Sequence, residues 1–563
     1  MVMYIYITKK YKGLINLNNL KVKFEDGREV EVPYKTKAIE AVKLVENNIK
    51  DILALKINNE IRTYDYSLVQ DSHIEFVKFA SSDGYRVYSR TLKMVLHMAL
   101  TSLFSNTKVD FISTINNDQY FTVENIKLTD EKVKMVKEKM QEYIDKDLPI
   151  TKKMVSVEEA TGLYIASNSE DKLKNIGNRL RSYISMYFCD GMYNNFYGVL
   201  APSTGYITLF DLVPYKDGAL LVIPDKNMNI KKETNETRLY DSFISFNELD
   251  NLLGIKNVGD LNDVILKNKI NDVIQVAEAI HERKLVELVL DIEKRKDVKM
   301  ILIAGPSSSG KTTFAQKLGI QLKLTGYNPI TISMDNYFVE RKDTPLGEDG
   351  KYNFECVEAL DINLFNTQMK DLIDGKTVEL PEFDFMTGTK KYNGKMLSLK
   401  KNDILIVEGI HALNPILTKF TPDENKYKVY IAPIATLNID GYTKVSSSDT
   451  RLLRRMVRDY VTRGHSVERT FELWNNVKKG EEQYIFPFVE TVDYIYNSSL
   501  IYEPSVMKIF AQPLLLQLDN TSQYYSESRR LYEYLNNFLP METSNIPINS
   551  IIREFIGNGC FYR

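Results

Sequence analysis

A glycine-rich stretch in the second half of the chain has the spacing of a phosphate-binding loop. GPSSSGKTT begins at Gly305 and matches G-x-x-x-x-G-K-[ST], with Lys311 as its lysine. In this pattern backbone N–H groups surround phosphate oxygens, the lysine reaches the β- and γ-phosphates, and the hydroxyl after it binds Mg²⁺. The apolar run KMILIAG predicts a buried strand before the loop, and the periodic stretch 311–326 predicts a helix after it. This order would place a bound anion at a helix N-terminus.

Two acidic residues follow further apolar runs that predict buried parallel strands. Asp335 follows the run PITISM, and Glu408 closes the run DILIVE. Ligands of open parallel sheets bind outside the carboxyl ends of the strands, so Asp335 should face the same crevice as the phosphate loop. A carboxylate in the place of Glu408 is suited to hold Mg²⁺, directly or through water.

Arginines are concentrated between the fourth and fifth predicted strands of this region, 427–434 and 492–499. Arg451, Arg455 and Arg458 fall at i, i+4 and i+7 and would share one helix face. One interpretation is a solvated basic helix. The other is a lid that closes over a triphosphate and places guanidinium groups on the transferring phosphoryl group. The preceding phosphate loop favours the lid.

Length and composition limit the classes of protein that remain. The chain has 563 residues, 44% of them hydrophobic and 26% charged, which predicts an ordinary globular protein of roughly three or four domains. A net charge of −2 gives no global attraction to nucleic acid or membrane. Three widely spaced cysteines exclude a disulfide framework, and no apolar run has the length of a membrane span. The opening MVMYIYI lacks the features of a signal peptide, so we expect a cytoplasmic protein without a membrane partner.

The N-terminal half predicts a different architecture. Residues 20–32 alternate apolar and polar side chains around an Asp-Gly pair, which predicts a hairpin. A helix and two more strands should complete a small β-grasp module up to about residue 80. Helices are predicted from Tyr85 and over 129–147, short strands between 183 and 224, and a helix over 267–295 that leads to the phosphate loop.

Two stretches of this half, 129–160 and 199–207, resemble the editing region of threonyl-tRNA synthetases, and the β-grasp resembles their TGS domain. That family places three histidines and a cysteine at a zinc-type or editing cluster. The matching positions here are Tyr88, Leu92, Phe196 and Leu200, which offer neither an imidazole nor a thiolate. The resemblance therefore implies the architecture without its chemistry. His97 lies near the motif but outside it, and we expect an ordinary packed or surface histidine.

The second half resembles the uridine kinase and phosphoribulokinase family over residues 299–519. Six ordered elements carry the resemblance: GPSSSGKTT, SMDNYF, YNF with ALD, PEFDF, VEGI and SSDTRLLRRMVRD. Combined with the N-terminal modules, it resembles a bacterial class of long uridine kinase-like nucleoside kinases, whose C-terminal end fits SIIREFIGNGCFY. The resemblance implies ATP and Mg²⁺, with Asp335 as the base for the attacking hydroxyl and Thr312 and Glu408 at the metal.

The remaining site assignments also rest on this resemblance together with the motif. The ATP-binding residues are Gly305, Pro306, Ser307, Ser308, Ser309, Gly310, Lys311, Thr312, Thr313 and Arg454. The catalytic residues are Asp335, Lys311, Arg455 and Arg458, and the acceptor-binding residues are Asp335, Tyr337, Glu355, Phe383, Asp384, Arg451 and Arg463.

The chain departs from the family at two positions that concern the acceptor. Glu355 stands where uridine kinases carry an aspartate, and Gly388 stands where they carry a histidine that helps to read the pyrimidine edge. The identity of the base therefore stays open. Phe383 could stack on a base or belong to the core, and both interpretations remain.

The predicted fold is multidomain, α+β followed by α/β. Its segments are a TGS-like β-grasp (1–83), a threonyl-tRNA synthetase editing-like domain (84–230), a helical connector (231–297), a P-loop kinase with a doubly wound parallel sheet (298–519) and a C-terminal helical extension (520–563).

The predicted function is ATP-dependent phosphorylation of a sugar hydroxyl. The acceptor that the resemblance favours is the 5′-OH of a uridine- or cytidine-like nucleoside. One alternative acceptor is another small alcohol or a sugar phosphate, as in phosphoribulokinase. A second alternative is an RNA-associated, nucleotide-dependent regulator that uses the TGS- and synthetase-like half. An oligomer is left open.

The lost cluster generates a prediction about metal content. Purified protein should contain no stoichiometric zinc, because Tyr88, Leu92, Phe196 and Leu200 supply no ligands. Elemental analysis measures this directly. One zinc ion per chain would contradict the interpretation of the N-terminal half.

Overall fold

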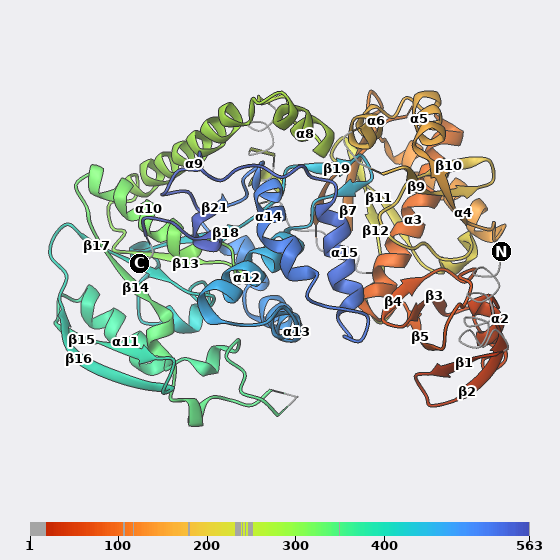
Figure 1. Cartoon of the computed structure of the whole chain (residues 1–563). Coiled ribbons are helices and arrows are strands. Elements are labelled where there is room, and N and C mark those ends of the chain that lie inside the picture. The colour runs from red at the N-terminus through yellow and green to blue at the C-terminus, as the bar shows by residue number, and fades with distance from the viewer. Residues whose placement is uncertain are drawn as a thin grey trace, which may run out of the picture. The chain divides into compact units, whose positions relative to one another are not determined.

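The structure, a computed structural model, describes residues 19–561 except 105–106, 116–117, 178–180, 231–237, 239, 243, 246–251 and 348–349. The opening MVMYIYI and part of the predicted connector thus lie outside the described residues. The chain forms two compact units (Figure 1). Unit 1 comprises Met1–Thr234, Asp440–Thr443 and Leu515–Tyr534, and unit 2 comprises Asn235–Ile439, Lys444–Leu514 and Leu535–Arg563. This division is coarser than the five predicted segments, whose boundaries stay a prediction.

The first sheet of unit 1 has the strand order β2-β1-β5-β3-β4. The alternation around the Asp-Gly pair produces the expected antiparallel hairpin, with Val22 opposite Val30. Gly27 closes its turn at φ +87°, in the left-handed region that favours glycine. The elements are β1 (Asn19–Phe24), β2 (Glu29–Pro33), α2 (Ala38–Lys43), β3 (Ile52–Ile57), β4 (Glu60–Arg62) and β5 (Ser72–Lys78).

The rest of unit 1 contains a four-stranded sheet of order β11-β12-β7-β6 and a three-stranded sheet of order β10-β9-β8. The two long predicted helices are present as α3 (Ser82–Leu103) and α4 (Asp130–Asp145). The other elements are β6 (Val109–Ile115), β7 (Asp118–Val123), β8 (Thr151–Ser156), α5 (Val157–Ala166), α6 (Glu170–Gly177), β9 (Tyr183–Cys189), β10 (Met192–Asn194), β11 (Asp211–Tyr215), β12 (Gly218–Val222) and α15 (Tyr525–Leu535).

The four positions that replace the synthetase cluster are buried in the apolar core of unit 1. The Tyr88 hydroxyl accepts the backbone N–H groups of Thr208 and Leu209 at 3.1 and 2.9 Å. Nearby, His97 is a packed histidine: its ring nitrogens lie 2.8 Å from the Tyr442 hydroxyl and 3.2 Å from the Tyr193 carbonyl oxygen. Burial lowers the pKa of His97 to about 4, so this imidazole is neutral at physiological pH.

Unit 2 is built on a five-stranded sheet of order β14-β17-β13-β18-β21, in which every pairing is parallel. These are the five strands that the apolar runs predict, and the parallel P-loop sheet is confirmed. The strands are β13 (Met300–Ala304), β14 (Asn328–Ser333), β17 (Asp403–Glu408), β18 (Lys426–Ala432) and β21 (Tyr494–Asn497). The strand before the phosphate loop, β13, is central and completely buried.

One strand differs from its prediction. β14 was expected to be buried, but it is an edge strand whose residues are mostly exposed or half-buried. Pro329 explains why, because a proline lacks the N–H that an inner strand must donate and is therefore confined to sheet edges.

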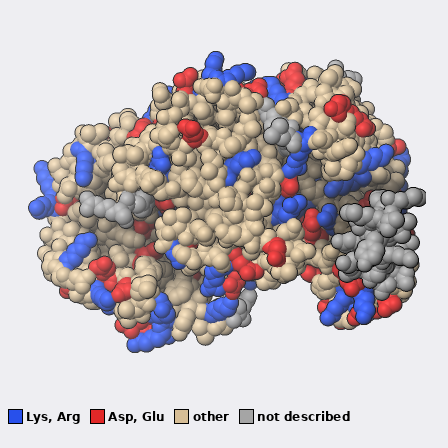
Figure 2. Space-filling view, viewed as in Figure 1, with Lys and Arg blue, Asp and Glu red and all other residues tan. Residues whose placement is uncertain are grey.

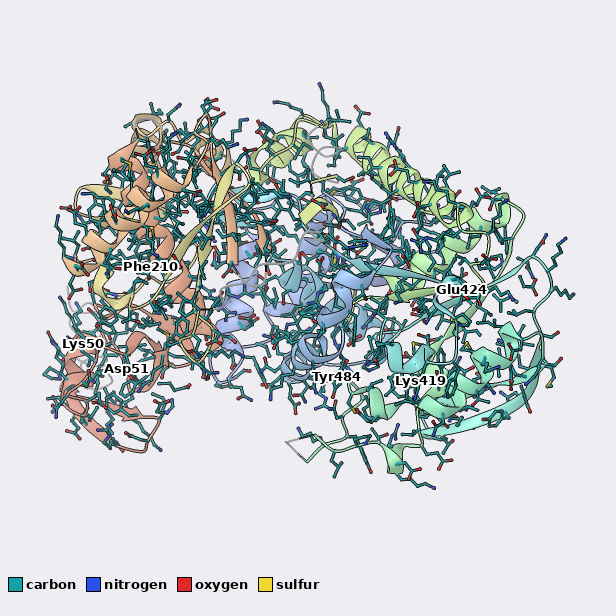
Figure 3. The ribbon with its side chains drawn as sticks, turned by 180° about the vertical axis from the view of Figure 1, so that it is seen from behind. Lys50, Asp51, Phe210, Lys419, Glu424 and Tyr484 are labelled. Atoms are coloured by element: carbon teal, nitrogen blue, oxygen red, sulfur yellow. The ribbon has the colours of Figure 1, made fainter. Side chains whose placement is uncertain are left out.

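Helices complete unit 2. The predicted helix over 267–295 is α9 (Ile270–Glu293), and α10 (Lys311–Leu324) packs against it and against β14 and β17. Figure 3 shows the ribbon from behind and labels Tyr484, the last residue of α13. The other helices are α8 (Val258–Leu266), α11 (Ile362–Ile373), α12 (Ser447–Arg463), α13 (Val467–Tyr484), α14 (Glu503–Leu515) and α16 (Arg553–Ile556), and the short strands are β15 (Val378–Asp384) and β16 (Thr389–Leu397). β19 (Asn438–Asp440) and β20 (Thr443–Lys444) include the ends of the segment Asp440–Thr443, which belongs to unit 1.

Charged side chains of both signs are interspersed over the face shown in Figure 2, as the small net charge leads one to expect. Of the helices that the structure describes, none is both long enough and apolar enough to cross a membrane.

Candidate active site

The phosphate loop joins β13 to α10, as its sequence predicts. Gly310 stands at the N-cap of α10 with φ +90°. Gly305 is required for a different reason, because a Cβ there would lie 2.1 Å from the Ile431 carbonyl oxygen. The Lys311 ammonium donates to the carbonyl oxygens of Gly305 and Pro306 at 2.9 and 3.2 Å. The lysine therefore rests on its own loop, within reach of the groups that the loop encloses.

Two carboxylates at the ends of neighbouring strands lie beside this lysine. Ser333, at the end of β14, is in register with Glu408 at the end of β17, and Asp335 follows two residues later. Burial, and then the nearby Asp335, raise the pKa of Glu408 to about 7, while Lys311 opposes the shift. Lys311, Asp335 and Glu408 thus lie close enough to shift one another's pKa, and we call them the charged cluster.

Asp335 is accessible to solvent, but its surroundings disfavour the charged form of its carboxyl group. It is exposed to solvent, yet enough protein surrounds it for desolvation to raise its pKa. Lys311, Arg463 and Arg458 act in the opposite direction and favour the carboxylate form. A carboxylate that is accessible, and whose pKa is raised above its usual range, is suited to accept a proton.

The oxygen ligands needed for Mg²⁺ are present in the same place. Thr312 is exposed at the start of α10, and Glu408 supplies carboxylate oxygens at the end of β17. Within the described part of the chain, no group of three or more His, Cys, Asp or Glu residues could hold a metal ion alone. This set fits Mg²⁺, which typically binds through one or two carboxylates together with substrate phosphates.

The arginines of α12 divide into two groups. Arg451 and Arg455 reach Ser307 of the loop: Arg451 pairs with the buried Glu481 and lies 3.5 Å from the Ser307 carbonyl oxygen, and Arg455 donates to the Ser307 hydroxyl at 2.9 Å. Arg458 and Arg463 pair with Asp459, at 3.0 and 3.4 Å, as Arg455 also does at 3.3 Å, and the charges of Arg458 and Arg463 favour the carboxylate form of Asp335. The helix therefore brings guanidinium groups to both the loop and the acidic residue.

Arg454, predicted to bind ATP, is completely buried beneath the loop. Its guanidinium forms a two-pronged ion pair with Glu503, at 2.5 and 2.6 Å. It also donates to the Ser498 carbonyl oxygen at 2.8 Å and lies 3.4 and 3.3 Å from the carbonyl oxygens of Ser308 and Ser309. Arg454 thus positions the phosphate loop from below.

The predicted acceptor residues are only partly brought together. Glu355 is half-buried near the charged cluster: burial raises its pKa, and Arg455 is the strongest opposing influence. Tyr337 is fully buried and donates its hydroxyl to Gln368 at 2.8 Å. Phe383 is also in the core, which favours the second of its two interpretations. Phe385, which follows the end of β15, is 57% exposed.

Gly388 stands at the position of the expected histidine, and the Arg341 side chain lies against it. A Cβ on Gly388, at φ +70°, would lie 2.8 Å from the Arg341 side chain, which fills this space. Arg341 donates to the Phe385 carbonyl oxygen at 2.7 Å. Asp384 accepts the N–H groups of Met386 and Thr387 in the same turn and pairs with Lys391, which lowers its pKa to about 2. Asp384 therefore shapes the turn that presents Phe385 and Arg341.

Sequence reasoning missed several residues of this region. Besides Arg341 and Phe385, the missed residues are Glu481, Glu503 and Glu554. No local pattern marks these glutamates, since each acts through a contact with a residue at least 30 positions away.

Comparisons with known proteins concern this same part of the chain. The family described as Phosphoribulokinase / Uridine kinase family matches residues 300–500. Uridine kinases of Staphylococcus aureus strains JH9 and Newman are 30% identical over 201 residues, which is 36% of this chain and 87% of each relative. Two solved structures are also similar. The first, "Structure of a Possible Uridine Kinase from Bacillus stearothermophilus", is 17% identical with a TM-score of 0.25, covering 38% of this chain and 98% of that one. The second, D-glycerate 3-kinase from Cryptococcus neoformans, is 14% identical with a TM-score of 0.20, covering 46% and 86%.

The buried arginine generates a stability prediction. Replacing Arg454 by methionine should destabilise unit 2 by about 3–5 kcal/mol, because Glu503 would keep a buried charge without its partner. Denaturant unfolding followed by circular dichroism measures the loss, and R454M/E503Q should recover part of it. The exposed Arg463→Met is the matched control, with a change within about 0.5 kcal/mol. Wild-type stability in R454M would contradict this role.

Proposed function

Because this chain belongs to the phosphoribulokinase/uridine kinase family, and is therefore a kinase, we propose that it transfers the γ-phosphate of ATP to the 5′-OH of a nucleoside. The charged cluster beside the phosphate loop is the observation that carries this proposal. It joins an ammonium, a proton acceptor and a carboxylate for a cation at the ends of strands β13, β14 and β17.

The proposed mechanism rests on position and charge more than on covalent chemistry. Lys311 leaves the carbonyl oxygens of its loop and pairs with the β- and γ-phosphates. Arg455 and Arg458 stabilise charge on the transferring phosphoryl group. Asp335 accepts the proton of the attacking hydroxyl, and its raised pKa makes it a better acceptor than an ordinary aspartate.

Thr312 and Glu408 are the residues that would hold Mg²⁺. A cation held there would supply positive charge next to the phosphate oxygens. Because both residues adjoin Lys311, the cation and the ammonium would act on the same phosphates.

The acceptor is proposed to lie near Glu355 and the turn that follows β15. Phe385 offers an exposed ring for stacking on a base, and Glu355 takes the place of the aspartate in uridine kinases. One observation favours the alternative acceptor, a sugar phosphate: Arg341 places a guanidinium where the base-reading histidine is expected, and guanidinium groups bind phosphate well.

We also propose that unit 1 contains the TGS-like and synthetase-like modules. The support is the strand order of its first sheet, with β1 parallel to β5, and the burial of the four positions that replace the editing cluster. An RNA-binding role of this half stays an alternative that binding of tRNA to the full chain would test.

A screen of acceptors tests the proposed function. Full-length protein is mixed with ATP and Mg²⁺ and with uridine, cytidine, adenosine, ribulose 5-phosphate or D-glycerate, and ADP release is measured. Uridine or cytidine should give the highest kcat/KM. Turnover of the sugar phosphate alone would select the alternative acceptor, and turnover of none would remove the proposed acceptor class.

The first mechanistic prediction concerns the base. Asp335→Asn keeps the shape of the side chain but cannot accept a proton, so kcat should fall by roughly 10²–10⁴-fold while ADP still binds. Asp374→Asn, an exposed aspartate on the same unit, is the control and should leave kcat unchanged. Near-normal turnover by D335N would remove Asp335 from the mechanism.

A second prediction concerns pH. Asp335 must be deprotonated to act, so kcat should fall as pH decreases through its raised pKa, at a higher pH than for an ordinary aspartate. Arg458→Gln removes a charge that favours the carboxylate form, so the acid limb of the profile should move to higher pH. Initial rates between pH 5 and 9 measure both curves. A limb that R458Q leaves in place, or moves to lower pH, would contradict this account.

A further inference from the structure

A glutamate from the C-terminal part of unit 2 already occupies donors of the phosphate loop. Thr313, the third residue of α10, donates its backbone N–H to Glu554 Oε2 at 3.2 Å and its hydroxyl to the same oxygen at 2.8 Å. The first backbone N–H groups of a helix that follows such a loop are donors for nucleotide phosphates. A carboxylate oxygen therefore stands where a phosphate oxygen would be bound.

The segment that carries Glu554 is packed closely against the loop. A Cβ on Gly310 would lie 2.7 Å from the side chain of Ile551, and the Phe555 ring lies 4.8 Å from the guanidinium carbon of Arg454. Arg553 anchors the segment by donating to the carbonyl oxygens of Thr543 and Ile546, both at 2.7 Å. Glu554 itself is only half-buried, so its side chain can rotate while the segment stays in place.

Glu554 also acts on the charged cluster. Its negative charge raises the pKa of both Lys311 and Glu408, so it is felt at the position where phosphate charge is to be bound. A carboxylate and a phosphate cannot share the Thr313 donors, because both are anions that need the same two hydrogens.

We propose that Glu554 is a built-in competitor for nucleotide phosphate, and that ATP or ADP binds only when this carboxylate has rotated away from Thr313. The inference rests on the proposed function in one respect, that residues 305–313 bind a nucleotide. The apparent affinity for ATP or ADP is the intrinsic affinity multiplied by the fraction of molecules in which the Thr313 donors are free. Adenosine, which has no phosphate, is not subject to this competition.

The test compares nucleotide binding by full-length wild type and Glu554→Gln. The amide keeps the size of the side chain but loses its charge, so it holds Thr313 less strongly and does not repel phosphate. Calorimetry should show ADP binding about tenfold tighter to E554Q and adenosine binding unchanged. Glu542→Gln removes an exposed charge from the same C-terminal part of the unit and should match the wild type.

Other results would overturn this inference or the proposed function. If Glu554 only caps α10, E554Q will bind ADP as wild type does, or more weakly, and that result overturns the inference. If E554Q folds poorly, Glu554→Asp serves as a second variant, because it keeps the charge but shortens the side chain by one methylene. Its ADP affinity should exceed that of wild type. An equal or lower affinity would likewise overturn the inference. ADP binding needs no acceptor, so a tighter-binding E554Q that phosphorylates nothing keeps this inference and removes the proposed function. If wild type phosphorylates a nucleoside and E554Q binds ADP with unchanged affinity, the proposed function is kept and this inference is removed.

Discussion

The site depends on one buried guanidinium. Arg454 has no exposed surface, and it joins α12 to Glu503 at the start of α14 and to the carbonyl oxygens of Ser308 and Ser309. A phosphate loop must direct its N–H groups inward, so its carbonyl groups need partners outside the enclosed space. Arg454 supplies them, and by doing so fixes the distance between the loop and the helix that carries the other arginines.

The arrangement around this contact balances charges of both signs at short range. Burial raises the pKa of Asp335, Glu355 and Glu408, and nearby positive charge from Lys311 and, at Asp335 and Glu355, from arginines of α12 opposes that rise in part. A triphosphate with its cation would replace part of these internal partners. We infer that Glu554 holds one of those places when no nucleotide is bound.

Local patterns in the sequence predicted the strands and the phosphate loop of unit 2. They did not predict the side-chain contacts between residues distant in sequence. Runs of apolar residues predicted the five parallel strands, and the loop spacing placed Gly305 and Lys311 correctly, because both signals are contained in a few neighbouring residues. The edge position of β14 required knowledge of strand order. The two interpretations of Phe383 stayed open and Phe385 was missed, because tertiary packing decides which ring is buried. Glu554 lies 241 residues from Thr313, and no periodicity records such a contact.

The central claim is that this cluster transfers phosphate from ATP to a nucleoside hydroxyl. Its most direct test is to follow the phosphorus by ³¹P NMR in a mixture of full-length protein, ATP, Mg²⁺ and uridine, beside the same mixture with Lys311→Ala. The account predicts that wild type forms a nucleoside 5′-monophosphate in step with ADP, and that K311A forms neither at a comparable rate. Release of inorganic phosphate without a phosphorylated nucleoside, or equal product formation by K311A, would contradict it.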